Sequence, residues 1–349
     1  MTVRVGVVIA AMNSVEYLDQ ALGSLATQTV PVDEIVVVDD SSDDNTAAHA
    51  RRWTSVLPLR VIGTGRRTGI WGGRRAGIAE LTTDLVMQLD ADDMFAPHHV
   101  EVMCEAYTRR PGLVSPRPLT WTGRGPWQQA DYPKARFPLP GDQLAQLLCT
   151  NYVLVGAMYP RKLYEEIGGY RRTRYGEDWD LWLRLVAAGA MVSKPDEATY
   201  VYRVRAASYS SLFDKDVAQT EVLTRFLSAC DSPVYRRVAK LALLQRIGPA
   251  FTEGLEARPV TAAQELILAE AGLSPERVRA AHADPELGLV VRVGTGAGTD
   301  GGEHIAVLGS APERLVLAGP VCAGGRVEAD LIEDETLRRD RSSLRDILR

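Results

Sequence analysis

Residues 85–93 read LVMQLDADD, an apolar run that ends in a cluster of aspartates. A short apolar run of this kind is typical of a strand that is buried on both faces of a parallel sheet. The aspartates would then stand at the carboxyl end of the strand, which is the edge where open α/β sheets bind their ligands. This stretch therefore predicts the type of sheet and one side of a binding site.

Similar strand-like runs recur in the first part of the chain and alternate with helical patterns. The strand-like runs lie at 3–9, 34–38 and 57–62, and the helical patterns lie at 15–25, at 46–53 and after a glycine-rich segment at 63–73. Strands and helices that alternate at this spacing predict an α/β fold with a Rossmann-like, mostly parallel sheet flanked by helices.

Polar signals follow the first two of these strands. Asn13, three residues before Glu16, predicts a capping box at the start of the first helix. Residues 39–44 read DDSSDD and come directly after the strand at 34–38. Because the carboxyl ends of parallel strands meet at one edge of a sheet, we expect this acidic cluster beside that of 90–93.

The rest of the chain has a less regular pattern. Residues 117–150 lose periodicity and are rich in proline, which predicts a long functional loop. Further expected elements are a strand at 152–159, a helix at 161–167, a helix from 177 to 189, a strand at 199–202, helices at 215–230, 233–246 and 260–272, and a small β unit within 287–320. We expect a first domain over 1–212 and a helical, then β-rich, C-terminal extension over 213–349.

Composition limits the class of protein. The 349 residues suffice for roughly two domains. With 46% hydrophobic and 24% charged residues, the chain has the composition of a soluble globular protein and not of a disordered or fibrous one. The net charge of -5 argues against nucleic acid as a partner, because that would need a basic surface.

The spacing of the cysteines and the sequence of the N-terminus indicate the cellular compartment of the protein. The four cysteines lie far apart and form no CxxC pair, which argues against a disulfide framework or a zinc site. The chain shows neither a secretory apolar region nor an apolar stretch of about 18 residues that could span a membrane. We expect a cytoplasmic protein without a transmembrane segment, one that could also lie peripherally at a membrane.

Two acidic groups carry candidate chemistry. Asp90 and Asp92 would repel each other unless a cation joins them, and carboxylate oxygens suit Mg²⁺ or Mn²⁺. The alternative is that Asp92 or Asp93 caps a helix that begins near Pro97. A second acidic group, residues 177–180, opens a predicted helix, where its charges could simply complement the helix dipole.

Five motifs occur in a fixed order along the chain. They are VVIAAMN at 7–13, VVVDDSSDDNT at 36–46, GIWGGRRAGI at 69–78, LDADD at 89–93 and GEDWDLW at 176–182. This series resembles the family 2 glycosyltransferases of the GT-A fold. The resemblance extends over about residues 3 to 210, and no similar resemblance is found for 212–349.

The resemblance implies a site for a nucleoside diphosphate sugar. Its donor-binding residues would be Ala10, Ala11, Asn13, Asp40, Arg67, Arg74, Asp90, Ala91, Asp92, Glu177 and Arg205. Asp40 matches the carboxylate that accepts from the uracil ring, and Arg74 matches an arginine that contacts the nucleotide or diphosphate. The alternatives are an Asx turn for Asp40 and a helix-surface position for Arg74.

The resemblance also implies a mechanism. Asp178 matches the general base, which takes the proton of an acceptor hydroxyl while its oxygen attacks the anomeric carbon, with inversion. A Mg²⁺ or Mn²⁺ ion at Asp92 would neutralise charge on the departing diphosphate. Arg205 stands where the family often has a metal-binding histidine, and arginine cannot ligate a cation. Either the metal relies on Asp92, diphosphate and water, or Arg205 itself binds the diphosphate.

The expected activity is transfer of a sugar from a UDP-linked donor to a hydroxyl of a small molecule, saccharide or cell-surface precursor. Two alternatives stay open, a nucleotidyltransferase, which would release pyrophosphate, and a non-catalytic module that binds nucleotide or saccharide. Acceptor contacts are expected from 117–150 and 152–176. The extension at 213–349 could cover the site, form a homodimer or recruit a partner.

Overall fold

The computed structural model describes residues 3–129, 138, 141–205, 215–232, 235–236, 238–239, 242–243, 290–295 and 303–308. The chain divides into two compact units. Unit 1 lies within residues 1–135 and 151–213, and unit 2 lies within 136–150 and 214–347. Residues 136–150 thus group with the later part of the chain.

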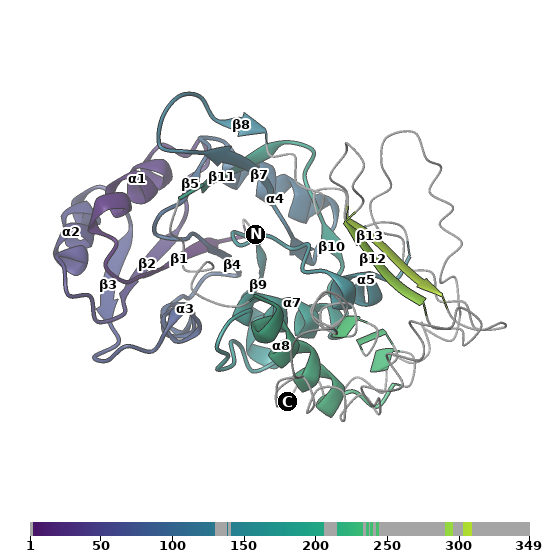
Figure 1. Ribbon diagram of the computed structural model, residues 1–349. Coiled ribbons are helices and arrows are strands. Elements are labelled where there is room, and N and C mark those ends of the chain that lie inside the picture. The colour runs from purple at the N-terminus through teal and green to yellow at the C-terminus, as the bar shows by residue number, and fades with distance from the viewer. Residues whose placement is uncertain are drawn as a thin grey trace. The chain divides into compact units, whose positions relative to one another are not determined.

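A five-stranded sheet forms the centre of unit 1, with the strand order β3-β2-β1-β4-β9 (Figure 1). Its strands are β1 (Val5–Ala11), β2 (Glu34–Asp39), β3 (Leu59–Gly63), β4 (Leu85–Gln88) and β9 (Tyr159–Pro160). The first four strands are parallel, and β9 runs antiparallel to β4. The predicted α/β fold with a mostly parallel sheet is confirmed.

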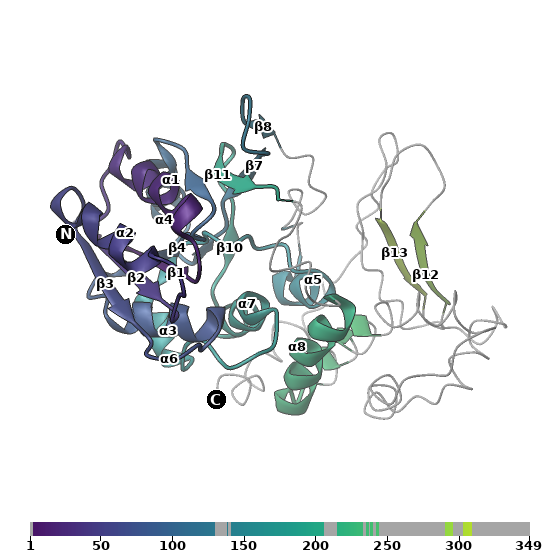
Figure 2. The same ribbon diagram turned by 60° about the vertical axis from the view of Figure 1, so that its left-hand side comes forward.

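Helices cover both faces of this sheet. They are α1 (Val15–Ala26), α2 (Thr46–Arg52) with the short 3-10 helix η1 (Trp53–Ser55), α3 (Ile70–Ala79), α4 (His99–Arg109), α6 (Arg161–Glu166) and α7 (Glu177–Ala187). In both views α1 and α3 lie on opposite sides of the strands (Figures 1 and 2).

The alternation of side chains along β1 explains why helices pack on both faces of the sheet. Val7 and Ile9 belong to the buried cluster that includes Leu18 and Leu22 of α1. The intervening residue Val8 points to the other face, where α3 approaches very closely. A Cβ atom added at Gly77 of α3 would lie 2.5 Å from Val8 Cγ1. Glycine at this position therefore lets α3 pack directly onto the strands.

A second, four-stranded sheet has the order β5-β11-β7-β8. It consists of β5 (Met94–Phe95), β11 (Ala198–Arg203), β7 (Arg117–Trp121) and β8 (Gln128–Gln129), and a separate pair joins β6 (Leu113–Val114) to β10 (Val192–Ser193). The prediction of a long loop over 117–150 is therefore wrong for 117–121 and 128–129, which form strands. β7 forms because it pairs with β11, which lies about eighty residues later, and no local pattern records such a pairing.

Two local predictions also differ from the structure. The expected strand at 152–159 is reduced to β9, because Leu154 N–H donates to Ser115 Oγ (3.1 Å) instead of joining a strand ladder. The capping box is wrong as well, since Ser14 is the N-cap of α1. Asn13 adopts a left-handed conformation (φ 50°), and its Oδ1 accepts from the backbone of Asp43 at 2.8 Å. It thus ties together the two loops that follow β1 and β2.

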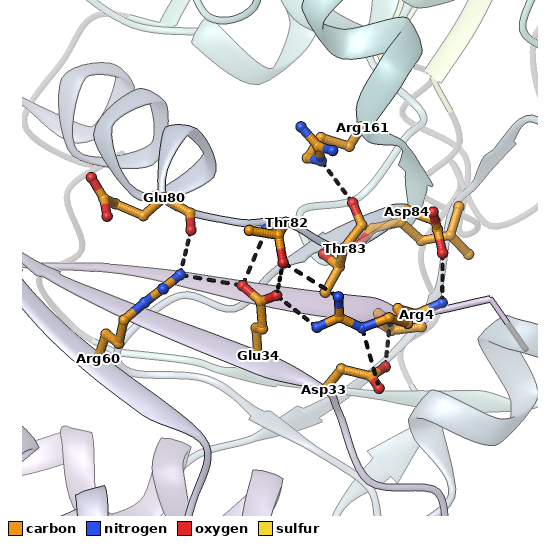
Figure 3. A network of polar contacts seen from close by, with 11 residues as sticks. Arg4, Asp33, Glu34, Arg60, Glu80, Thr82, Thr83, Asp84 and Arg161 are labelled. Atoms are coloured by element: carbon orange, nitrogen blue, oxygen red, sulfur yellow. Dashed lines mark hydrogen bonds and ion pairs between the residues drawn. The ribbon is translucent and has the colours of Figure 1, made fainter.

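An ionic network joins the amino ends of the strands, at the edge opposite the acidic clusters (Figure 3). Glu34 accepts from Arg4 Nη2 at 2.8 Å, from Arg60 Nη2 at 3.2 Å and from the backbone of Thr82 at 3.1 Å. The backbone of Arg4 donates to Asp84. Burial acts to raise the pKa of Glu34, but the hydrogen bonds from Thr82 and Arg4 outweigh it and lower the pKa.

Unit 2 contains two described helices and a described β-hairpin besides short helical pieces. α5 (Gln143–Cys149) begins at Asp142, whose side chain caps it, and α8 (Lys215–Ala229) occupies the predicted helix at 215–230. Tyr235 donates to Asp142 Oδ2 at 2.7 Å. The hairpin of β12 (Val290–Thr295) and β13 (Glu303–Leu308) lies within the expected β unit. The helix predicted at 260–272 and most of that at 233–246 lie outside the described residues.

Candidate active site

A cavity of about 330 Å³ opens at the carboxyl ends of the central strands, within unit 1. Its lining comes from the loops after β1, β2, β3 and β4, from the segment before β9, from the start of α7 and from the end of β11. It includes the expected general base Asp178 and, of the residues expected to bind the donor, Ala10, Ala11, Asn13, Asp40, Arg74, Asp90, Ala91, Asp92, Glu177 and Arg205. Arg67 is not among the lining residues, and its exposed side chain pairs with Asp43.

Asp40 is buried and holds the loop that leads into α3. Its carboxylate accepts from the backbone N–H groups of Thr68 and Gly69, both at 2.8 Å, and from the hydroxyls of Thr64 and Thr68, also at 2.8 Å. Gly69 has a left-handed backbone (φ 78°), as the tight entry into the helix requires. Any ligand N–H that reaches Asp40 must therefore share an oxygen that already accepts from this loop.

Arg74 is buried and joins two carboxylates beneath the cavity. Its Nη2 donates to Asp90 Oδ1 and its Nη1 to Glu177 Oε1, both at 2.7 Å. Burial alone would lower the pKa of Arg74, but Asp90, Tyr170 and Glu177 raise it well above its ordinary value, so the guanidinium stays charged. This fork connects α3, the end of β4 and the start of α7, and Arg74 is not the helix-surface residue of the alternative interpretation.

Glu177 differs from its neighbour Asp178 in surroundings. Burial raises the pKa of Glu177 to about 7, with Asp178 adding to the rise and Arg74 opposing it. Asp178 accepts from Asn151 Nδ2 at 3.3 Å and from the backbone of Trp179 at 2.7 Å. The two residues follow Gly176, a left-handed N-cap (φ 76°) from which α7 starts at the cavity.

The rest of the first turn of α7 is structural. Asp180 forms a buried ion pair with Arg184, with distances of 2.9 and 2.8 Å to Nε and Nη2. Trp179 and Trp182 are fully buried. Both tryptophans therefore pack in the core. The three acids at 177–180 therefore have three different environments, and a shared helix-dipole role does not describe them.

The aspartates after β4 also separate by environment. Asp92 pairs with Arg205, and burial together with Asp90 raises the pKa of Asp92. Asp93 is buried and accepts from Tyr200 Oη at 2.7 Å and from the backbone of Arg203 at 2.8 Å, which ties the loop to β11. Neither caps α4, since the N-cap of that helix is His98.

Comparison with known proteins identifies a family that resembles the part of the chain that carries this cavity. The family model described as glycosyl transferase family 2 matches residues 6–168, which include four of the loops that reach the cavity. Residues 6–168 of this chain belong to glycosyl transferase family 2. It is thus a glycosyltransferase that moves a sugar from a nucleotide sugar, in a family whose enzymes are inverting.

Two curated relatives illustrate the similarity. This glycosyltransferase is 26% identical over 223 residues to the uncharacterized glycosyltransferase YwdF of Bacillus subtilis (strain 168), covering 64% of this chain and 82% of the relative. It is 29% identical over 202 residues to the amylovoran biosynthesis glycosyltransferase AmsE of Erwinia amylovora, covering 55% and 72%.

Two solved structures share the fold. The complex of S. aureus TarS 1-349 with UDP-GlcNAc has a TM-score of 0.62 at 18% identity and covers 77% of this chain and 80% of that one. The mannosyltransferase PcManGT from Pyrobaculum calidifontis, in complex with GDP-Man and Mn2+, has a TM-score of 0.55 at 19% identity and covers 80% and 83%. At these identities the likeness concerns the fold, and the expected GT-A fold is confirmed.

Within the cavity of this glycosyltransferase, Asp92 is the proposed ligand of a divalent cation. Both aspartates line the cavity, where Asp90 pairs with the buried Arg74 and Asp92 pairs through Oδ2 with the less buried Arg205. No group of three or more His, Cys, Asp or Glu side chains that could hold a metal occurs in the described part of the chain. Mg²⁺ in phosphate-handling sites commonly takes one or two carboxylates and completes its shell with phosphate and water. A cation with few protein ligands is therefore consistent with this site.

Tyr17 and Tyr202 line the cavity but were not expected from the sequence, whereas Val155 and Tyr175 come from the range 152–176, where acceptor contacts were expected. Tyr17 lies outside the apolar stripe of its helix, which is the one signal that could have singled it out. Its ring centroid lies 5.0 Å from the guanidinium carbon of Arg205. Trp127, within the range 117–150 from which acceptor contacts were expected, is 41% exposed. No helix among the described residues is long and apolar enough to cross a membrane.

Proposed function

We propose that this glycosyltransferase takes its sugar from a UDP-linked donor and passes it to a hydroxyl of a saccharide or small-molecule acceptor. The transfer is a single displacement with inversion, in which Asp178 is the general base and a divalent cation binds at Asp92. One observation carries the proposal. Asp40, Asp92, Asp178 and Arg205, which lie far apart in the sequence, all line one cavity of about 330 Å³, a volume within the usual range for ligand sites.

The nucleoside end of the cavity is assigned to the loops after β1 and β2. Ala10 and Ala11 line it and carry no bulky side chain. Asp40 faces it with oxygens that accept N–H groups, and a uracil ring carries an imide N–H. The structural similarity to TarS, which is bound to UDP-GlcNAc, supports a UDP donor.

The diphosphate end is assigned to Asp92 and Arg205. The guanidinium of Arg205 is a permanent forked donor, which suits phosphate oxygens. Its Nε is buried without a hydrogen-bond partner among the described residues, so it retains capacity to donate. Asp92 would hold a divalent cation, which would supply charge neutralisation at the leaving diphosphate.

Asp178 is better placed than Glu177 to act as the base. Both residues line the cavity, but Glu177 is bonded to the charged Arg74 at 2.7 Å, whereas Asp178 accepts from the uncharged Asn151 at 3.3 Å. Its carboxylate takes the proton of the acceptor hydroxyl while the hydroxyl oxygen bonds to the anomeric carbon. The bond between that carbon and the diphosphate oxygen breaks at the same time, on the opposite face.

Aromatic side chains suggest the acceptor class. Tyr17, Tyr175 and Tyr202 line the same cavity, and Tyr202 is 38% exposed. Aromatic rings present flat apolar faces with a polar tip, which suits the mixed surface of a sugar ring. This supports a saccharide acceptor.

The test is a donor screen followed by turnover. UDP, GDP and dTDP sugars are compared by thermal shift, because a ligand raises the unfolding midpoint only if the native state binds it. Release of nucleoside diphosphate is then measured with and without Mn²⁺ and with a panel of saccharides. Asp178→Asn is expected to lower turnover by about 10² to 10⁴-fold with donor binding retained.

Other outcomes would contradict the proposal. Release of pyrophosphate in place of nucleoside diphosphate would indicate a nucleotidyltransferase. Tight donor binding without any release, across the whole saccharide panel, would indicate a binding module. A preference for GDP or dTDP sugars would correct the donor while leaving the transfer itself in place.

A further inference from the structure

The segment that precedes β9 follows a fixed path beside the cavity. Leu154 N–H donates to the hydroxyl of the buried Ser115 at 3.1 Å. Gly156 has a left-handed backbone (φ 92°), and any side chain there would collide with the ring of Tyr200. The segment is therefore held at two neighbouring points, and Val155 between them lines the cavity.

Asn151 lies at the start of this segment and contacts the proposed base. Its Nδ2 donates to Asp178 Oδ2 at 3.3 Å. Its Oδ1 is buried and has no hydrogen-bond partner in the part of the chain that the structure describes. The opposite amide orientation would place Oδ1 against a carboxylate oxygen, acceptor facing acceptor, so an ionised Asp178 selects the observed orientation.

The Asp178 carboxylate is thereby held from two separate elements. Oδ1 accepts from the backbone of Trp179 within α7, and Oδ2 accepts from Asn151. Among the described residues, Glu177, Arg74 and Tyr170 also interact electrostatically with Asp178. Glu177 is bonded to Arg74, whereas Asn151 contacts the base with an uncharged donor.

We propose that Asn151 is a positioning residue for the transfer reaction. Its amide holds Asp178 in the orientation in which the carboxylate meets the acceptor hydroxyl, and it favours the ionised form by donating to it. Asn151 is not among the residues that line the cavity, so it acts through Asp178 and not on the donor. The inference rests on the proposed function, in which Asp178 is the base.

Two variants of Asn151 separate the effect of its hydrogen bond to Asp178 from the effect of its size. The readout is release of nucleoside diphosphate from UDP-GlcNAc and GDP-mannose, with water or a saccharide panel as acceptor. Asn151→Ala is expected to lower kcat about tenfold with the donor KM within about twofold, because misplacing a catalytic group by an ångström can cost more than that. Asn151→Asp keeps the shape but replaces the donor by a second carboxylate, so the acid limb of the pH–rate profile moves to higher pH.

Asn45→Ala is the matched control. Asn45 is an exposed residue at the start of α2, and its side chain makes no capping hydrogen bond. This variant is expected to keep the wild-type kcat, KM and pH profile. Donor affinity by calorimetry is expected to be unchanged in all three variants, a readout that does not depend on turnover.

The outcomes distinguish this inference from the proposed function. If Asp178→Asn abolishes turnover while both Asn151 variants keep the wild-type kcat and pH profile, Asn151 has no positioning role. If Asp178→Asn retains turnover, or the wild-type protein binds donor and releases nothing, the proposed function fails and this inference falls with it. Asn151→Asp, which is isosteric, remains the test if Asn151→Ala does not fold.

Discussion

Arg74 and Glu177 are separated by 103 positions in the chain, and their side chains meet at 2.7 Å in the interior of unit 1. The other arm of the Arg74 fork binds Asp90 at the same distance. One buried cation therefore links the aspartate loop after β4 to the helix that carries the proposed base. The site depends on this contact for its shape as well as its charge.

Removal of Arg74 is expected to destabilise the protein strongly. Arg74→Met leaves Asp90 and Glu177 without their shared cation, and breaking a buried pair costs about 3–5 kcal/mol of unfolding free energy. Urea denaturation followed by circular dichroism measures the change. Arg67→Met is the control, since Arg67 is exposed and its loss should change stability by about 0.5 kcal/mol or less. Equal effects of the two variants would contradict the role of Arg74.

The raised pKa of Glu177 makes stability depend on pH. The native state holds this proton up to about pH 7, whereas the ordinary pKa of the side chain is 4.5. Its contribution to stability is therefore fully present below pH 4.5 and is lost as the pH rises through about 7. Glu177→Gln removes this dependence, so the wild-type protein should lose more stability than the variant between about pH 5 and pH 8. Parallel pH profiles in urea denaturation would show that Glu177 titrates normally.

Glycine in α3 is expected to be required for packing. Gly77→Ala would place Cβ 2.5 Å from Val8 Cγ1 and 2.8 Å from Val38 Cγ2, and overpacking of this kind costs about 1–3 kcal/mol. Gly23→Ala in α1 is the matched control, because its nearest neighbour would be Trp53 at 3.6 Å. There the higher helix propensity of alanine should stabilise by up to about 1 kcal/mol. Opposite shifts in the thermal midpoint are the expected result, and shifts of the same sign would argue against close packing of α3.

Loss of the Arg205 side chain is expected to raise the affinity for a metal ion and to lower the affinity for a nucleotide. Arg205→Ala removes the cation that pairs with Asp92, so Mn²⁺ alone should bind more tightly. UDP alone should bind about tenfold more weakly, because a phosphate-binding guanidinium is lost. Calorimetry with each ligand separately measures both effects, with Arg52→Ala on the exposed end of α2 as control. Unchanged affinity for both ligands would remove Arg205 from the site.

Much of the architecture follows from local pattern. The strands β1, β2, β3 and β4 were predictable because buried parallel strands appear as short apolar runs, and their order with the helices implies a parallel sheet. The convergence of 39–44 and 90–93 at one edge followed from strand direction alone. The GT-A resemblance rested on the same loops, together with the start of α7.

The amino-acid sequence by itself determined which loops reach the site and which chemical groups they bring, because strand direction and burial period are properties of short segments. Only the tertiary structure decided the partner of each side chain. It placed Arg74 between two carboxylates, engaged Asp40 with the loop at 64–69, put Arg67 outside the cavity lining and brought Asn151 to Asp178. The physical reason is that these contacts join residues far apart in the chain, and packing of whole elements, not any local periodicity, sets their distances.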